Sequence, residues 1–186
     1  MDHKQLHVGK KEERLATLAA IESRKSNSSF KHGAIIYQGN KKICAGYNNT
    51  TRTCYRKNIC CTIHAEMDTV TRFLNSFIKI HTTRNDDKIR RKMGKYSICV
   101  VRSSIDVDGK LCLLNSLPCR DCLRKLQMVG LNKVIYSDNN EEIRAARISD
   151  IQTNHLNWSN VMKIPEVMNK LRIVPLIRYN HKKLNI

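Results

Sequence analysis

Apolar and polar residues along this chain follow two different periods. A period near 3.6 residues, which is typical of amphipathic helices, covers three segments. These expected helices are residues 11–25, residues 63–75 with Thr62 as the N-cap, and a stretch that begins at Pro118 and ends at Gly130. Each carries one apolar stripe, so each is expected to pack one face against a core.

Short apolar runs between these helices are typical of β-strands. The expected strands are residues 33–38 and 42–47, joined into a hairpin by Gly39-Asn40, and then 96–102, 111–114 and 133–137. Asn139-Asn140 favours a tight turn, and the charged segment 141–148 that follows fits either a strand or a helix. The alternation of strands and helices predicts an α/β sandwich in which helices cover a central sheet.

Length and composition fit one compact domain. The chain has 186 residues, of which 41% are apolar, enough for one core and few for two. We expect a domain over residues 11–150 and a C-terminal extension, 151–186, packed on it. Residues 1–10 are polar and no apolar run reaches the ~18 residues of a membrane span, so we expect no membrane partner and an intracellular, cytoplasmic protein.

Two short motifs carry the chemistry. His64-Ala65-Glu66 and Pro118-Cys119-Arg120-Asp121-Cys122 offer one imidazole and two thiols at the spacing of zinc-dependent nucleobase deaminases. His64, Cys119 and Cys122 would hold Zn²⁺ and leave a fourth position for water, the pattern of a catalytic zinc. Glu66, which is not a ligand in this pattern, would move the protons of that water. A redox pair or half of a structural zinc site would leave the Glu66 carboxylate without a role.

These motifs resemble those of the cytidine deaminase superfamily, and most closely its deoxycytidylate deaminase branch. Residues 31–36 (KHGAII) are similar to the V-G-A-x-I strand of that branch, and residues 45–50 (AGYNNT) to its G-Y-N-G-x motif. The resemblance covers roughly residues 15–137. It implies a three-layer α/β sandwich, a mixed central sheet with helices on both faces, and assembly into a homo-oligomer.

The resemblance also implies roles for residues around the motifs. Glu66 would be the catalytic acid and base of a hydrolytic deamination, and Asn48 would contact the sugar of the substrate. Ala65, beside Glu66, and Arg52, which follows the Asn48 segment, complete the expected substrate-binding set. A strand after residue 137 that returns antiparallel is associated with deaminases of free nucleosides. A helix and then a parallel strand are associated with the deoxycytidylate and nucleic-acid-editing branches.

Charge points to a substrate or partner that bears phosphate. There are 34 Lys and Arg residues against 16 Asp and Glu, a net charge of +18. The densest basic cluster lies within residues 76–95, whereas aromatic residues make up only 5% of the chain, few for stacking along a single strand. We therefore expect a zinc-dependent hydrolase that deaminates a cytosine nucleotide, dCMP or CMP. The alternatives are a cytidine or adenosine deaminase that edits single-stranded DNA or RNA, and a catalytically silent zinc module that binds nucleic acid.

The other cysteines raise the question of a second metal. Cys54, Cys60 and Cys61, together with His81 or Cys112, supply enough thiol and imidazole groups for another zinc site, although their spacing is not a standard ligand pattern. Cys44 and Cys99 lie in expected strands and are expected to be small buried residues.

Overall fold

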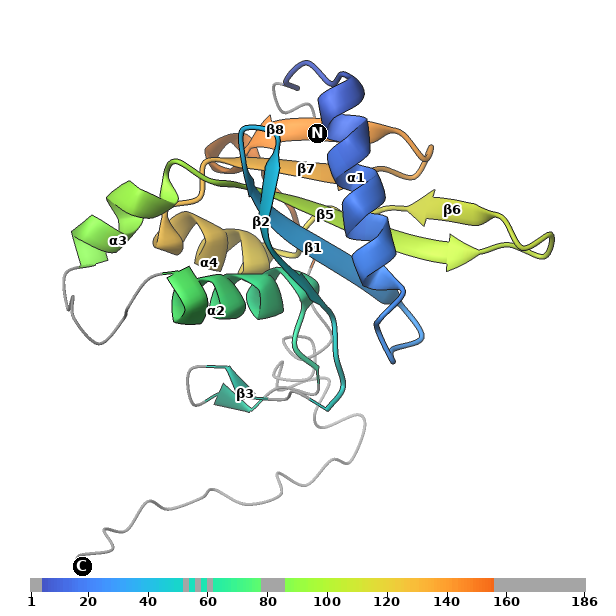
Figure 1. Cartoon of the computed structure of the whole chain (residues 1–186), viewed down its shortest axis with the longest axis horizontal. Helices are drawn as coiled ribbons and strands as arrows, with labels where there is room; N and C mark the ends of the chain where they lie inside the picture. The colour runs from blue at the N-terminus through green and yellow to red at the C-terminus, as the bar shows by residue number, and fades with distance from the viewer. Residues whose placement is uncertain (1–4, 52–53, 56–57, 60–61, 78–85, 156–186) are drawn as a thin grey trace, which may run out of the picture.

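A computed structural model describes residues 5–155 except 52–53, 56–57, 60–61 and 78–85 (Figure 1). The helices are α1 (Lys10–Ser23), α2 (Ala65–Phe77), α3 (Asp86–Met93) and α4 (Arg120–Val129). The strands are β1 (Lys31–Gln38), β2 (Lys41–Tyr47), β3 (Cys54–Tyr55), β4 (Asn58–Ile59), β5 (Ser97–Ile105), β6 (Leu111–Leu114), β7 (Lys133–Ser137) and β8 (Ile143–Arg147). None of these described helices is long and apolar enough to cross a membrane.

One mixed sheet organises the fold. Its strand order is β2-β1-β5-β7-β8, and β6 pairs with the far end of β5. β5 and β7 run parallel, whereas the other neighbouring pairs run antiparallel. The carboxyl ends of β5 and β7 therefore lie at one edge of the sheet, where α/β proteins place their ligand sites.

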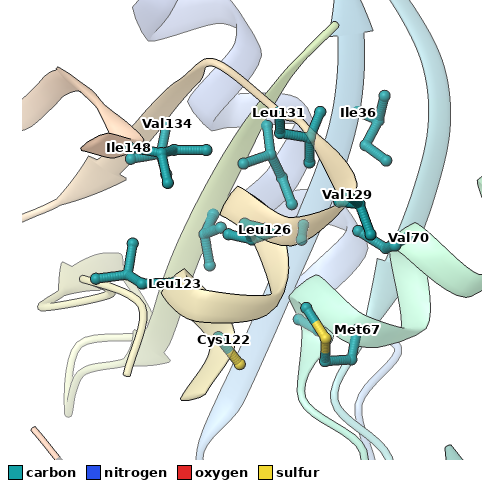
Figure 2. Close-up of a cluster of buried hydrophobic side chains, with 14 of the residues drawn as sticks. Ile36, Met67, Val70, Cys122, Leu123, Leu126, Val129, Leu131, Val134 and Ile148 are labelled. Carbon is teal, nitrogen blue, oxygen red and sulfur yellow. The ribbon is translucent and has the colours of Figure 1, made fainter. Parts of the chain in front are cut away.

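Side chains that alternate along the strands divide the core into two halves. On β1, Ala34 and Ile36 enter one apolar cluster, whereas Ile35 and Tyr37 enter the other. α1 covers the Ile35 face, and α2 and α4 cover the Ala34 face (Figure 1). Figure 2 shows the Ala34 face, where side chains of α2 and α4 pack against those of the strands. The expected three-layer α/β sandwich is confirmed.

Two glycines allow the layers to approach closely. A Cβ atom on Gly33 would lie 2.1 Å from the Ala19 carbonyl oxygen of α1, and one on Gly46 would lie 2.6 Å from Thr69 Oγ1 of α2. Hydrogen bonds reinforce the second contact: Asp68 Oδ2 accepts from the Tyr47 N–H at 3.2 Å. The start of α2 is thereby fixed over the sheet.

The hairpin of β1 and β2, the strand β6 and the helix α4 lie where the pattern predicted them. Gly130 ends α4 in the left-handed conformation, with φ of 90°. The predicted start of α2 was wrong by two residues. Ile63 pairs with Asn49 in an isolated β-bridge, so the helix begins at Ala65, and the His64 carbonyl accepts its first hydrogen bond, from the Asp68 N–H. His64, rather than Thr62, is the residue at the N-cap.

Segment 141–148, which fits both a strand and a helix, contains the strand β8. It runs antiparallel to β7, with Lys133 opposite Arg147. Of the proposed C-terminal extension, Ile151 is buried in the core that contains α4, and the His155 carbonyl accepts a hydrogen bond from the Arg120 N–H at 3.0 Å. Residues 156–186 lie outside the described part of the chain, so the packing of the extension as a whole stays a prediction.

A candidate zinc centre and its cavity

His64, Cys119 and Cys122 come together as the motif spacing predicted. Their ligand atoms all lie within 4.8 Å of one another. His64 Nδ1 lies 3.3 Å from Cys122 Sγ and 3.7 Å from Cys119 Sγ. A tetrahedral zinc with Zn–N near 2.0 Å and Zn–S near 2.3 Å would separate nitrogen and sulfur by about 3.5 Å. The three residues therefore fit a zinc ion.

Two helix starts position these ligands. His64 is the residue before α2, Cys119 is the N-cap of α4, and Cys122 lies in the first turn of α4. The unpaired N–H groups and the positive dipole end of each helix favour thiolate over thiol. The bounds of α4 are specified by local sequence, because Pro118 precedes the helix and Gly130 ends it.

Hydrogen bonds among His64, Cys119 and Cys122 shift the pKa values of these three residues. A hydrogen bond from the Cys122 thiol, joined by one from His64, lowers the pKa of Cys119 to about 4 in spite of burial. The same hydrogen bond, together with burial, raises the pKa of Cys122. Burial disfavours the imidazolium of His64, but its hydrogen bond with Cys119 and the charge of Glu66 outweigh burial and raise its pKa. A cation entering the site would displace these protons.

Glu66 lies next to the ligands in the first turn of α2. Its side chain is only 5% exposed. Burial raises the pKa of Glu66, and the charge of His64 only partly offsets this effect. A carboxylate with a raised pKa is suited to accept a proton and to pass it on.

A cavity of about 280 Å³ opens beside these residues. Its wall is formed by Ser28, Phe30, His32, Asn48, Thr62, His64, Ala65, Glu66, Ser116, Leu117, Cys119 and His155. Phe30, His32 and His155 were not among the residues predicted from the sequence. His32 carried a usable signal, because it occupies the place of valine in the strand motif that residues 31–36 resemble.

The expected substrate-binding residues have different surroundings. Asn48 lines the cavity, but its side chain also holds the neighbouring backbone: Nδ2 donates to the Phe30 carbonyl at 2.6 Å, and Oδ1 accepts from the His32 N–H at 2.8 Å. Ala65 lines the cavity, and as the first residue of α2 its N–H has no acceptor in a preceding helical turn. Arg52 lies outside the described residues.

The cysteines of the hypothetical second metal site are also outside the described side chains. This applies to Cys54, Cys60, Cys61 and His81. Cys112 Sγ lies 3.6 Å from Asp106 Oδ2, at the tip of the β5–β6 hairpin. In the part of the chain that the structure describes, the His64 group is the metal-ligating cluster found.

Comparison with known proteins agrees with this site. Residues 10–138 match the family model of the cytidine and deoxycytidylate deaminase zinc-binding region. The chain belongs to this family of zinc-binding deaminases. No curated protein sequence matches it significantly.

One solved structure shows the same fold at low sequence identity, and two further structures are similar with lower TM-scores. Cytidine deaminase from Burkholderia pseudomallei is 17% identical, with a TM-score of 0.50 over 77% of this chain and 98% of that chain. The dCMP deaminase from the cyanophage S-TIM5 is 20% identical in its apo form, with a TM-score of 0.48 over 73% of this chain and 88% of that chain. The same phage enzyme in complex with dCMP and dUMP gives a TM-score of 0.47 at 20% identity, over 72% of this chain and 85% of that chain.

Proposed function

We propose that this protein is a zinc-dependent hydrolase that converts a cytosine nucleotide, dCMP or CMP, to the uracil nucleotide and ammonia. One observation carries the proposal: the three zinc-compatible residues and the buried Glu66 carboxyl group lie together beside one cavity. Zinc bound by His64, Cys119 and Cys122 would act as a Lewis acid that lowers the pKa of a water molecule towards about 7.

Glu66 supplies the proton transfers. It accepts a proton from water and delivers it to N3 of the cytosine ring, while the water oxygen bonds to the carbon that bears the amino group. Glu66 then takes the remaining hydroxyl proton and gives it to the departing amino group. One water is consumed and one ammonia is released, with no oxidation or reduction.

The size of the cavity and the placement of basic groups favour a small substrate. A volume of about 280 Å³ lies just below the usual range of ligand pockets, about 300–1,000 Å³, and suits a small substrate. The basic residues Arg90, Arg91 and Lys92 end α3, and the Arg90 carbonyl lies against Gly130, at the opposite end of α4 from Cys119. They are therefore poorly placed to guide a polynucleotide into the cavity, which argues against the editing alternative.

A free nucleoside is a second candidate, and one observation favours it. β7 and β8 run antiparallel, the arrangement that the family resemblance associates with nucleoside deaminases. The net charge of +18 instead favours a substrate that bears phosphate.

A single comparison of substrates separates these possibilities. The zinc-loaded protein is incubated with cytidine, deoxycytidine, CMP, dCMP, adenosine and a cytosine-containing single-stranded oligonucleotide at two salt concentrations, and ammonia and deaminated product are measured. The proposal expects the monophosphates to have the highest kcat/KM. Conversion of the oligonucleotide alone, with a steep salt dependence, would support editing. Zinc binding without conversion of any substrate would support the silent module.

We also propose that the protein forms a homo-oligomer, as the family resemblance implies. Light scattering at the concentrations used for activity measures the mass of the species. A fully active monomer would contradict this part of the proposal.

A further inference from the structure

Arg102 of β5 projects from the same face of the sheet as the candidate zinc centre. Its Cα partner on β1 is His32, which lines the cavity, and paired residues of an antiparallel ladder point to the same side. Two residues earlier on β5, Val100 belongs to the core that contains α2 and α4. Ser103, the next residue, points to the other face, where its hydroxyl meets that of Ser23 on α1 at 2.5 Å.

The Arg102 guanidinium lies on an aromatic ring at the rim of the cavity. Its central carbon is 4.6 Å from the centroid of the Phe30 ring, and Phe30 is 62% exposed although it forms part of the cavity wall. Stacking uses the face of the guanidinium and leaves its N–H groups at the edge free to donate. Among the described residues no carboxylate pairs with Arg102.

The described groups around Arg102 do not offer a second fixed cation at this part of the cavity. Burial lowers the pKa of His32 to about 4 against the hydrogen bond to the Phe30 carbonyl, and repulsion from Arg102 adds to burial, so His32 is neutral. Lys31 Nζ donates to the Ser26 carbonyl at 2.7 Å. His155 lies at the rim and is exposed. Among the residues that the structure describes, Arg102 is therefore the permanently charged donor beside this part of the cavity.

We propose that Arg102, held in place by Phe30, binds the phosphate of a cytosine nucleoside monophosphate and so selects nucleotides over nucleosides. The planar guanidinium presents parallel N–H donors that match two phosphate oxygens, and the aromatic stack fixes its orientation before the ligand arrives. The inference rests on the proposed deaminase and adds the group that recognises the phosphate.

The test compares deamination of dCMP, deoxycytidine and a cytosine-containing single-stranded oligonucleotide by wild type, Arg102→Met, Arg102→Lys and Arg14→Met. Arg14 is an exposed residue of α1, on the opposite face of the sheet, and serves as the matched control. We expect Arg102→Met to lower kcat/KM for dCMP by about 10- to 100-fold, the range expected for a lost charge-assisted contact, and to leave deoxycytidine within about two-fold of wild type. Arg102→Lys should retain part of the dCMP activity, because lysine keeps the positive charge but lacks the two parallel N–H donors of the guanidinium. Arg14→Met should behave as wild type.

An equal loss on both substrates, or no loss on dCMP, would overturn the inference. So would a loss confined to a cytosine-containing oligonucleotide, which would assign Arg102 to a phosphodiester. Calorimetric titration of dCMP and deoxycytidine into the wild-type and Arg102→Met proteins measures binding without turnover. It therefore distinguishes failure of the Arg102 inference from failure of the proposed function. If wild type deaminates nothing, the proposed function fails, while a preference for dCMP in binding that Arg102→Met abolishes would still support the phosphate contact.

Discussion

Asn48 and His32 are joined by two hydrogen bonds, one between main chains and one through a side chain. The Asn48 N–H donates to the His32 carbonyl at 3.1 Å, and Asn48 Oδ1 accepts from the His32 N–H at 2.8 Å. Because Asn48 Nδ2 also donates to the Phe30 carbonyl, one amide holds both residues that form this wall of the cavity. The asparagine expected to contact substrate thus also shapes the surface that the substrate meets.

Asn48→Ala should therefore reduce stability as well as activity. It leaves the His32 N–H and the Phe30 carbonyl without their side-chain partner, at about 1 kcal/mol for each of these part-buried hydrogen bonds. For a chain of this size Tm falls by about 2–4 °C for each kcal/mol, so a decrease of about 5 °C is expected by calorimetry. Asn48→Asp keeps the acceptor for His32 and should lose less. An unchanged Tm with a raised KM would instead mean that Asn48 acts only on the substrate.

Local patterns predicted well that His64, Cys119 and Cys122 would come together, because each motif lies at one helix start. The spacing of Cys119 and Cys122 and the proline before them specify one turn of helix without any help from the rest of the chain. The hairpin at Gly39-Asn40 is local in the same sense. The residues that a sequence pattern predicts most securely are those whose partners lie only a few positions away.

Features that depend on distant partners were not predictable in this way. Ile63 fits a helical stripe, but its pairing with Asn49 delays the helix start. Segment 141–148 suits two structures by composition, and pairing with β7, which buries Ala145 and Ala146, selects the strand. The stacking of Arg102 on Phe30 depends on the register between β5 and β1, which no short motif specifies.

One zinc ion per chain is expected in the purified protein. Replacing Cys119 and Cys122 together by serine removes two of three ligands and should reduce the zinc content measured by atomic emission to near zero. Cys112→Ser, which alters a thiol on the β5–β6 hairpin, is the control and should retain the metal. Full zinc occupancy in the double variant would refute the ligand assignment.

Glu66→Gln should abolish turnover while the zinc content and Tm stay close to wild type. The amide preserves shape inside the buried site but cannot accept and return a proton. Ammonia release measures turnover, and metal analysis of the same sample shows that the site is intact. Undiminished ammonia release by this variant would be incompatible with the proposed mechanism.

A partly buried ion pair between α1 and β7 should make stability decrease in acid. Lys133 Nζ lies 2.9 Å from Glu12 Oε1, and the Gly9 N–H donates to Glu12 Oε2. Burial raises the pKa of Glu12, but the hydrogen bonds from Lys133 and Gly9 outweigh burial, so its pKa lies below 4.5 in the folded protein. The stabilisation is present above the unfolded pKa and is lost as pH falls through the folded pKa.

Glu12→Gln should remove this part of the acid dependence, because the amide can still accept hydrogen bonds but cannot be protonated. Thermal melts of wild type and variant between about pH 3 and 7 measure the effect. We expect the difference in Tm to be largest near neutral pH, to correspond to about 1 kcal/mol, and to shrink towards pH 3. A difference independent of pH would contradict the assignment.

Ser116, three residues before Cys119, forms hydrogen bonds at the point where β5 changes its pairing from β7 to β6. β7 pairs with β5 up to Val100, and β6 takes over from Arg102. The Ser116 hydroxyl donates to the Val100 carbonyl and accepts from the Ser137 N–H, both at 2.8 Å, so it ties the loop that carries Cys119 to both parallel strands.

Ser116→Ala should leave two buried backbone groups unpaired and loosen this loop. A destabilisation of about 2 kcal/mol, or about 4–8 °C in Tm, is expected, together with faster loss of zinc to a competing chelator. Ser149→Ala, at an exposed serine bonded to Asp150, is the matched control and should change neither measurement. If Ser116→Ala lowered Tm but zinc were lost at the wild-type rate, Ser116 would stabilise the sheet without positioning Cys119. The geometry instead predicts faster loss of zinc, because Ser116 and Cys119 share one short loop between β6 and α4.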